Sequence, residues 1–544
     1  MSEFIGAMLV LVCFGYLVAI FDDLIFDLTY LFRRGRFRQT GLSKEELESD
    51  SPKRIAVMVA AWQEAGVVAE MVKATYRLMR YPEDRVEFFI GVYPNDEATL
   101  REVRELSKSN PRVHCVVNQR PGPTSKSQNL NEVFAFIQDL ENIRNQVFDV
   151  IAIHDAEDVI HPYAFRFYSA LLSRKDMVQL PVIAMFPKLP RWRWLNRIVA
   201  GTYADEFAES HLHHMLVRES FGLFVPSAGT GFALRREVVS FLAAEGPVFR
   251  EGSLTEDYDM SLRLWQKGFR VHFHVQRLKR IDDRGRVCNE VVGIKEYFPS
   301  EIRTAVKQKA RWIYGITMQS PKEIKPKRLS LKDRLVLWRD RKGKYTNLIH
   351  FVGYPLALYS VLAYFLGWPH ADPRLMLVLS GGVMLITLER LLMRFAAIKS
   401  VYGVAEALQA TLVLPLFPLR WFVGNIINAL ATARAWRMYF WPARGARKGT
   451  APAWDKTERK SYVPAEVLES VRRRLGDVLL FYGDVSPQEL ALALRTKPSG
   501  VPLGEILLRN QTLDPDRLRL RITETQERLQ NEPKVSALAV DYSD

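Results

Sequence analysis

The sequence predicts an α/β domain, followed by membrane-spanning helices and a small, mostly helical domain at the carboxyl end. Three observations support this prediction. Short apolar runs alternate with helical patterns from residue 54 onward, three apolar stretches are long enough to enter a bilayer, and two similar segments lie near the end of the chain. At 544 residues the chain exceeds what one hydrophobic core usually organises, so several domains are expected.

Four apolar runs predict the strands of the α/β domain. They are RIAVMVAA, VEFFIGVY, RVHCVVN and FDVIAIHD, and they are separated by segments with helical periodicity such as EAGVVAEMVKATYRLM and KSQNLNEVFAFIQDLENIR. Repeated alternation of strand and helix is typical of a parallel sheet with right-handed crossovers. Because ligands of such sheets bind beyond the carboxyl ends of the strands, the residues that follow each strand are the first candidates for a site.

Three apolar stretches predict membrane crossings. Residues 4–21 carry no charge, and residues 347–368 and 375–395 form a hairpin around the turn PHADPR. A fourth stretch, EALQATLVLPLFPLRWFVGNIINALA, holds two prolines and Arg420 at its centre, which favours a re-entrant or interfacial element. We therefore expect three full crossings, with the amino terminus outside.

The charge distribution indicates a membrane surface as a partner and not nucleic acid. The formal net charge is +15, and basic clusters at residues 33–38, 322–344 and 444–448 lie beside apolar segments. By the positive-inside rule these clusters are cytoplasmic. Glu389 and Arg390, near the cytoplasmic end of the third stretch, are expected to pair or to snorkel. The three cysteines form no close pair, which fits a reducing compartment.

Acidic residues follow three of the four predicted strands. Glu64 follows the first strand, Asp96 the second, and Asp155, Glu157 and Asp158 the fourth. Each of the first two is as easily a helix cap as a ligand, but carboxylates in corresponding places of successive units favour a nucleoside site. Carboxylates crowded after a buried strand raise one another's pKa unless a cation neutralises them. This crowding favours a hard divalent ion, shared with substrate phosphates, over a solvated acidic turn.

The stretch LTEDYDMSLRLWQKGFRV places Glu256, Asp257 and Asp259 directly ahead of an amphipathic helix. By itself this pattern favours a helix cap, because Thr255 suits the N-cap position and acidic residues complement the positive end of a helix. Upstream, SAGTGFALRREVV suits either a flat substrate that lies against the backbone or a tight turn before a helix. His161 is expected to be structural, with metal ligation as the minor alternative.

The stretch EIRTAVKQKARWIYGI predicts a helix with two faces. Its apolar residues define one face, and Gln308, Arg311 and Trp312 gather on another at helical spacing. An amide, a guanidinium and an indole on one face suit a diphosphate and a sugar ring. Arg and Trp beside a membrane serve equally well as interfacial anchors.

A repeat lies near the end of the chain. RLGDVLLFYGDVSPQELALAL matches PLGEILLRNQTLDPDRLRLRI at a constant offset of 28 residues. We expect two amphipathic helical hairpins that pack on each other. A Leu-Gly pair at the same point of each half requires a close backbone approach.

In this order, these features resemble glycosyltransferase family 2, which includes membrane-bound sugar polymerases such as cellulose and hyaluronan synthases. The likeness covers about residues 54–315 and rests on the two acidic strand ends, KSQNLN, DAED, TED and QKARW. It implies a GT-A (Rossmann-like) fold. It also implies a site of nucleotide-binding, metal-binding, catalytic and acceptor-side residues: Glu64, Asp96 and Lys126 on the nucleotide, Asp155 and Glu157 on Mg2+ or Mn2+, Asp257 as general base, and Gln308, Arg311 and Trp312 on the acceptor and diphosphate side. The family's second metal-site aspartate is Glu157 here, with Asp158 beside it, so either can reach the ion.

The carboxyl-terminal repeat resembles the MshEN domain, which is named for the amino-terminal part of certain secretion ATPases and binds cyclic di-GMP through two tandem motifs. The resemblance implies a set of nucleotide contacts: Arg474, Leu475, Gly476, Gly483, Leu503 and Gly504. The second motif has Pro502 where the family has Arg and Gln511 where it has Gly. These departures weaken the expected affinity.

Together these features predict an inverting glycosyltransferase of a bacterial inner membrane, with its catalytic and carboxyl-terminal domains in the cytoplasm. It would transfer sugar from a UDP-sugar to a polysaccharide or lipid acceptor, respond to cyclic di-GMP and work with an export partner in the outer membrane. The expected domains are residues 1–32, 50–320, 345–435 and 455–530. Two alternatives stay open: a non-catalytic cyclic di-GMP receptor or export scaffold, and a lipid glycosyltransferase that adds a single sugar.

Overall fold

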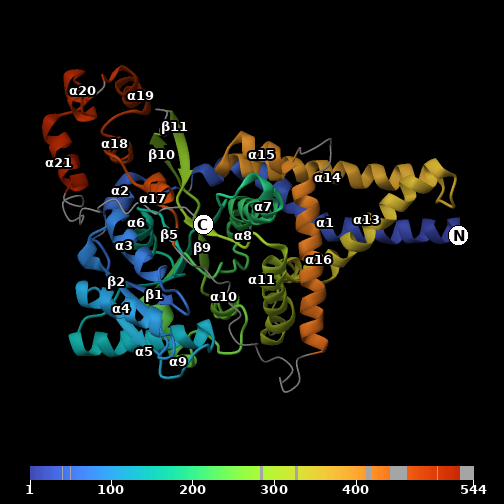
Figure 1. Ribbon diagram of the computed structural model, residues 1–544, viewed down its shortest axis with the longest axis horizontal. Helices are drawn as coiled ribbons and strands as arrows, with labels where there is room; N and C mark the ends of the chain where they lie inside the picture. Colours follow the sequence, from blue (N-terminus) through green and yellow to red (C-terminus); the bar gives the residue numbers. More distant parts are fainter. Residues whose placement is uncertain are drawn as a thin grey trace.

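The computed structural model describes residues 1–39, 41–49, 51–281, 286–324, 329–411, 418–441, 462–498 and 500–526. An α/β domain lies between two helical parts, a bundle of long helices on one side and a carboxyl-terminal set of short helices on the other (Figure 1). The expected order of an α/β domain, membrane helices and a helical tail is therefore present.

A seven-stranded sheet forms the centre of the α/β domain, with the strand order β3-β2-β1-β4-β8-β6-β9. Its strands are, in chain order, β1 (Ile55–Ala60), β2 (Val86–Val92), β3 (Val113–Val117), β4 (Val150–His154), β6 (Met177–Gln179), β8 (Phe232–Arg235) and β9 (Val271–Phe273). The four apolar runs form β1 to β4, which pair in parallel as predicted. Strands β1, β2 and β4 are buried along their whole length, which explains why their apolar runs are nearly continuous, and β3 forms the partly exposed edge of the sheet.

The second half of the sheet corrects the prediction of a parallel sheet. Strand β8 runs antiparallel to both β4 and β6, so the sheet is mixed. The chain leaves β6 at the carboxyl edge of the sheet, passes through α7 (Trp194–Glu209) and α8 (Met215–Ser220), and enters β8 from that same edge. Because no helix carries the chain back to the opposite edge, β8 has to run in the reverse direction.

Alternate residues of β1 face two different hydrophobic cores. Ile55, Val57 and Val59 pack in one core with α3 (Val68–Leu78), α4 (Glu97–Ser109) and α6 (Ala164–Leu171). The intervening residues pack in a second core with α5 (Lys126–Arg144), α9 (Arg236–Glu245) and α10 (Glu256–Gln266). The sheet is thus covered on both faces, and its polar edge at the carboxyl ends of β1 and β4 is left for a site.

Two smaller sheets extend the domain. In one of them β12 (Ile294–Tyr297) pairs in parallel with β7 (Val182–Met185) and antiparallel with β5 (Val159–Ile160). The other is a hairpin of β10 (Arg277–Ile281) and β11 (Val287–Val291). Strand β12 therefore lies beside the segment that follows β4, although the two are far apart in the sequence.

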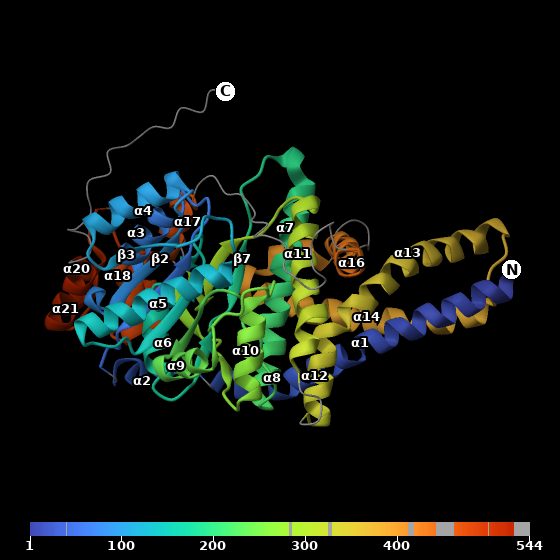
Figure 2. The same cartoon turned by 90° about the horizontal axis from the view of Figure 1, so that it is seen from below.

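Three helices are long and apolar enough to cross a membrane: α1 (Ser2–Gln39), α13 (Gly343–Leu366) and α14 (Pro373–Tyr402). They extend together from one end of the molecule in both views (Figures 1 and 2). Their number agrees with the predicted three crossings, and α1 continues well beyond the predicted apolar stretch. Helix α16 (Leu419–Phe440) packs on α11 (Ile302–Tyr314) and α13 and lies at a steep angle to α14 (Figure 1). The predicted break at Pro415 lies outside the described residues.

Arg390 forms ion pairs, one of the two outcomes expected for Glu389 and Arg390, but not with Glu389. The guanidinium of Arg390 binds the carboxylates of Asp27 and Glu209 instead, so it joins α14 to α1 and to α7. Adjacent residues on a helix point in different directions, which is why these two side chains do not meet. This ion-pair cluster attaches the long helices to the α/β domain.

The carboxyl-terminal repeat forms two helical hairpins, as predicted. Helix α17 (Ala465–Val471) leads into α18 (Leu475–Tyr482) and α19 (Pro487–Thr496), and α20 (Leu503–Arg509) and α21 (Pro515–Gln526) repeat the pattern. A methyl group added to Gly476 would lie 3.2 Å from Leu490, and one added to Gly504 would lie 3.1 Å from Leu518. Each glycine thus lies against the equivalent leucine of its own half, which confirms the predicted close approach.

Candidate active site

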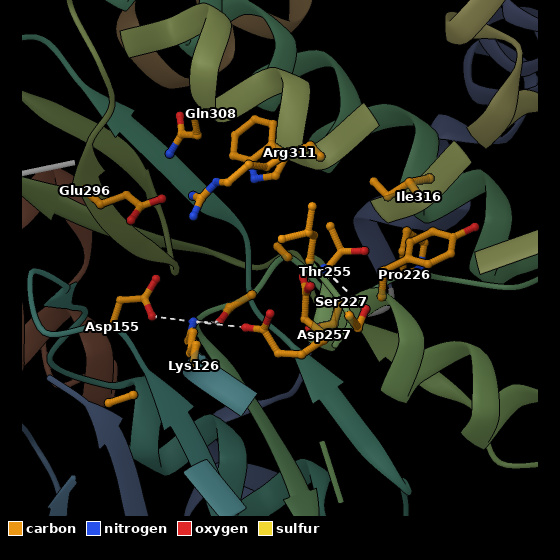
Figure 3. Close-up of a pocket in the computed structure, with 18 of the residues that line it drawn as sticks. Lys126, Asp155, Pro226, Ser227, Thr255, Asp257, Glu296, Gln308, Arg311 and Ile316 are labelled. Atoms are coloured by element: carbon orange, nitrogen blue, oxygen red, sulfur yellow. Dashed lines mark hydrogen bonds and ion pairs between the residues drawn. The ribbon is translucent and has the colours of Figure 1, made fainter. Parts of the chain in front are cut away.

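A polar cavity of about 430 Å³ opens at the carboxyl ends of β1 and β4. Most of the residues selected from the sequence line it together: Glu64, Lys126, Asp155, Glu157, Asp257, Gln308, Arg311 and Trp312. Figure 3 shows acidic residues, Lys126 and Arg311 pointing into one space from different elements. The cavity therefore joins segments that are up to about 250 residues apart in the chain.

The two acidic strand ends differ in their surroundings. Asp96 is the N-cap of α4, where its carboxylate accepts hydrogen bonds from the backbone N–H groups of Gln63 (2.5 Å) and Thr99 (3.4 Å). Among the described residues that line the cavity, Asp96 is absent. Glu64 does line it, and its own N–H donates to Thr99 Oγ1 (3.0 Å). Asp96 thus holds the loop that presents Glu64.

Three carboxylates converge on one side of the cavity. One oxygen from each of Asp155, Glu157 and Glu296 lies within 4.8 Å of the others. Asp155 and Glu157 come from the turn after β4, and Glu296 comes from β12. Hard oxygen donors in this number, partly open to the cavity, are the ligands that Mg2+ and Mn2+ prefer. The residues present therefore fit a divalent cation.

Sequence reasoning missed Glu296. It lies in GIKEYF, inside a short strand and not after the end of a main strand. Its side chain is mostly buried, with 8% exposed. Its burial, which the sequence does not show, marks it as a site residue, because acidic residues are rarely buried without a partner.

Asp158 faces the protein interior and not the cavity. It is fully buried, and its Oδ2 lies 2.8 Å from His154 Nδ1 and accepts hydrogen bonds from Asp155 N–H (3.2 Å) and from Thr230 Oγ1. Burial raises the pKa of Asp158 and lowers that of His154 to about 3. Glu157 thus lines the cavity, whereas the Asp158 carboxylate binds the backbone of its own turn.

Lys126, the first residue of α5, links the two acidic sides of the cavity. Its ammonium lies 2.5 Å from Asp155 Oδ1 and 3.7 Å from Glu256, and it donates to the carbonyl oxygen of Gly229 (2.9 Å). Burial alone would lower the pKa of Lys126, but Asp155 and Glu256 raise it above its ordinary value. The side chain is therefore a fixed positive charge between the turn after β4 and α10.

Asp257 lies in the first turn of α10 and points into the cavity (Figure 3). Thr255 occupies the N-cap position, but its side chain makes no capping hydrogen bond. Burial and, after it, the charge of Glu256 raise the pKa of Asp257, Lys126 lowers it, and the net result is a pKa of about 7. A carboxylate with a pKa near neutrality, open to a cavity, is suited to take up a proton.

Asp257 lies against Gly229 of the glycine-rich segment, and its environment differs from that of Asp259. Gly229 has a φ of 85°, and a methyl group added to it would lie 3.3 Å from Asp257 Oδ2. A close approach to the carboxylate therefore requires glycine there. Asp259 instead pairs with Arg250 (3.5 Å) and Arg263 (3.2 Å) and is buried behind the helix.

Helix α11 forms the opposite wall. Arg311 and Gln308 point from it into the cavity (Figure 3). The Trp312 ring is held by three aromatic rings at centroid distances of 6.0 to 6.4 Å, from Tyr203, Phe207 and Phe298. Aromatic contacts of this kind fix the plane of the indole. The wall thus presents a guanidinium, an amide and a rigid flat ring.

The residues selected in the tail lie apart from this cavity. Arg474, Leu475 and Gly476 are at the start of α18, and Gly483, with a φ of 65°, ends that helix. Leu503 and Gly504 occupy the corresponding place at the start of α20. The tail is therefore a second candidate site, distinct from the cavity of the α/β domain.

Comparison with known proteins places these features in a family. Residues 52–315 match the model described as "Glycosyltransferase like family 2". The chain is 35% identical over 531 residues to bacteriophage adsorption protein B of Escherichia coli K12, covering 92% of this chain and 68% of that protein. Bacteriophage N4 adsorption protein B of Escherichia coli O157:H7 matches to the same extent.

Solved structures also resemble the chain. A mannosyltransferase from Pyrobaculum calidifontis, in complex with GDP-Man and Mn2+, is 15% identical, with a TM-score of 0.46, and covers 81% of this chain and 100% of its own. Glucosyl-3-phosphoglycerate synthase from Mycobacterium tuberculosis, in complex with Mn2+, UDP-glucose and phosphoglyceric acid, is 13% identical, with a TM-score of 0.25, and covers 42% of this chain and 70% of its own.

Proposed function

The chain belongs to glycosyltransferase family 2, and on that premise we propose that it is an inverting glycosyltransferase that uses a UDP-sugar. The observation that carries this proposal is one cavity in which Lys126 lies between the carboxylates of Asp155, Glu157 and Glu296 and the first turn of α10, which holds Glu256 and Asp257. One side suits the diphosphate of the donor. The other side holds a base with a pKa near neutrality.

In the proposed reaction, Asp257 takes the proton of an acceptor hydroxyl, and the hydroxyl oxygen forms a bond to the anomeric carbon. The bond from that carbon to the diphosphate breaks, and UDP leaves with the electron pair. Lys126 and Arg311 provide positive charge on the leaving side. Attack from the side opposite the leaving group inverts the anomeric centre. Fixed charges and fixed geometry supply most of the acceleration in such a site.

A divalent cation fits the carboxylates on the leaving side. Asp155, Glu157 and Glu296 would hold it, and it would supply charge neutralisation for the diphosphate. Glu64 would bind the nucleoside end, and Asp96 would act by holding the Glu64 loop. Trp312 would stack under a sugar ring on the acceptor side.

Sugar transfer tests this proposal directly. Membranes containing the full chain are incubated with radiolabelled UDP-glucose, UDP-galactose and UDP-N-acetylglucosamine, and incorporated label is measured. Asp257→Asn should abolish incorporation and leave UDP binding nearly unchanged, because the amide cannot accept the proton. Glu251→Gln, an exposed neighbour, is the control for loss of one negative charge. Wild-type turnover in Asp257→Asn would remove the base from the proposal.

We also infer that the protein works in a bacterial inner membrane with the α/β domain in the cytoplasm. Three apolar helices and the basic clusters beside them support this placement. A polysaccharide or lipid would then accept the sugar at the membrane surface, and a product polymer would pass to an export partner in the outer membrane. Labelling of single cysteines on each side of sealed vesicles tests the orientation.

Cyclic di-GMP is the proposed regulator, acting through the tail. The first tail motif adjoins residues that contact the turn after β4. Tyr462 Oη donates to the carbonyl oxygen of Asp158 (2.7 Å), and Arg473 Nη2 donates to His161 Nε2 (2.5 Å) and to Glu290 (2.8 Å). His161 is thus a structural residue of this contact, as expected. Arg473 immediately precedes the motif residue Arg474.

Two further contacts connect α18 to the α/β domain. The carboxylate of Asp477 accepts a hydrogen bond from Ile281 N–H in β10 (3.1 Å), and the Phe481 ring stacks on Tyr163 at 4.1 Å. A ligand at the start of α18 would therefore act on helices that already touch the segment after β4. This arrangement supports a population shift between docked and displaced tails as the means of control.

Calorimetric titration of the full chain with cyclic di-GMP tests the regulatory part. Binding should be weakened at least tenfold by Arg474→Ala, because the resemblance to the MshEN domain makes this exposed side chain a nucleotide contact. Arg517→Ala, exposed on α21, is the matched control. A flat titration of the full chain would refute the regulatory proposal and leave the catalytic one standing.

A further inference from the structure

Helix α7 is interrupted next to the cavity by a single π-helical turn, Ser210–His214, before α8 begins. Such turns insert a residue into a helix and are concentrated at functional sites. His211 in this turn lines the cavity and is 5% exposed. The proposed reaction leaves this side chain without a role.

The proton of His211 can be placed from its hydrogen bond. The backbone N–H of Val182, the first residue of β7, donates to His211 Nδ1 (3.0 Å). Burial lowers the pKa of His211 to about 4, so the ring is neutral at physiological pH. A neutral imidazole carries one proton, and because Nδ1 accepts, that proton is on Nε2. Among the described residues, none hydrogen-bonds Nε2.

The ring stands in an aromatic wall. Phe207 contacts it edge-on at 4.9 Å and Phe273 lies at 5.1 Å. Phe207 also contacts Trp312, at 6.3 Å, so His211 adjoins the acceptor side of the cavity. The Nε2 atom is not fully buried, so its N–H is open to the cavity. A ligand group in the cavity can therefore accept a hydrogen bond from it.

We propose that His211 is a substrate-binding residue whose Nε2–H donates a hydrogen bond to a hydroxyl oxygen of a saccharide in the cavity. This inference rests on the proposed glycosyltransferase function. One neutral donor among aromatic rings suits a sugar, which offers hydroxyl oxygens and apolar C–H faces. Phosphate oxygens are matched instead by the charged groups of Lys126 and Arg311 in the same cavity. The hydroxyl belongs either to the donor sugar or to the acceptor.

Two substitutions separate binding from structure. In His211→Asn the amide oxygen takes the place of Nδ1, so Val182 N–H keeps its acceptor while the Nε2–H is lost. In His211→Gln the amide reaches the place of Nε2 and can donate, while Val182 N–H loses its partner. A binding role predicts impaired function in His211→Asn and retained function in His211→Gln, and a purely structural role predicts the reverse.

The full chain in detergent is titrated with UDP, UDP-glucose, UDP-galactose and UDP-N-acetylglucosamine, and transfer is measured in membranes. If the hydroxyl is on the donor, His211→Asn should weaken binding of the preferred UDP-sugar about tenfold and leave the affinity for UDP unchanged. If it is on the acceptor, affinity for both stays unchanged and transfer at saturating donor falls about tenfold. His211→Gln should stay within about threefold of wild type in both measurements.

Thermal unfolding of both variants shows whether each one is folded, and the functional measurements then decide the proposal. Wild-type binding and transfer in His211→Asn would overturn the proposal, and so would a loss of function in His211→Gln that exceeds the loss in His211→Asn. Absence of transfer in the wild-type chain would refute the proposed function. In that case the ratio of UDP-sugar affinity to UDP affinity decides the role of His211: an unchanged ratio in His211→Asn would overturn it.

Discussion

Sugar transfer is expected to slow steeply below pH 7, because the proposed base has to be ionised and burial raises the pKa of Asp257 from 3.8 to about 7. At pH 6 about one tenth of the side chains would be ionised, so the rate should be about tenfold below its plateau. An ordinary aspartate would be almost fully ionised at pH 6 and would show no change.

The substitution Glu256→Gln tests whether the pKa of Asp257 sets the pH dependence of transfer. The charge of Glu256 is the second cause of the raised pKa, after burial. Removing it should lower the pKa of Asp257 and move the acid limb of the pH profile to lower pH. The variant should therefore retain a larger share of its plateau rate at pH 6 than the wild type does.

The same shift affects folding. Because the folded-state pKa of Asp257 is raised, its contribution to stability is fully present below its ordinary pKa and is lost as the pH rises through about 7. Asp257→Asn, which cannot ionise, should unfold at a higher temperature than the wild type at pH 8 and at a similar temperature at pH 4.

Initial rates from pH 5 to 9, at constant ionic strength and saturating donor and metal, give the profile. Calorimetric UDP affinity at each pH separates loss of binding from loss of chemistry. A wild-type acid limb below pH 5 would refute the reasoning, and so would a limb that stays in place in Glu256→Gln.

Three further predictions concern other parts of the molecule. Glu296→Gln should weaken Mn2+ binding at least tenfold, measured by electron paramagnetic resonance, whereas the exposed Glu301→Gln should not; equal affinities would remove Glu296 from the metal site. Gly229→Ala should lower the transfer rate at least tenfold with little change in UDP affinity, since a φ of 85° and the 3.3 Å contact displace the neighbouring carboxylate; an unaltered rate would contradict this. Arg420→Met should destabilise the protein by about 3 to 5 kcal/mol in thermal or denaturant unfolding, because two carboxylates lose their buried partner, and the exposed Arg434→Met on the same helix should have little effect.

Local patterns in the sequence were sufficient for the first four strands. Strands β1, β2 and β4 are buried over their whole length, so each appears as a mostly apolar run. The Leu-Gly pairs of the tail were equally legible, since each glycine meets a leucine only 14 residues later in its own hairpin. In both cases the pattern and its cause lie within a short segment.

The residues of the cavity could be predicted only in part from the sequence. Motif order selected Asp155, Glu157 and Asp257, and these do line one cavity. It also selected Asp96, which the structure shows as a helix cap that holds the Glu64 loop. A cap and a ligand can share one sequence pattern, because both place a carboxylate at a helix start.

The sequence by itself determined the alternation of strands and helices, the apolar helices, the repeat of the tail and the types of charged group at the strand ends. Only the tertiary structure decided that β8 runs antiparallel, that Asp158 turns inward while Glu157 reaches the cavity, and that Glu296 joins it from β12. Each of these depends on which distant segments pack together. Side-chain periodicity specifies the buried face of a segment, but the partner of that face is chosen by the packing of the whole chain.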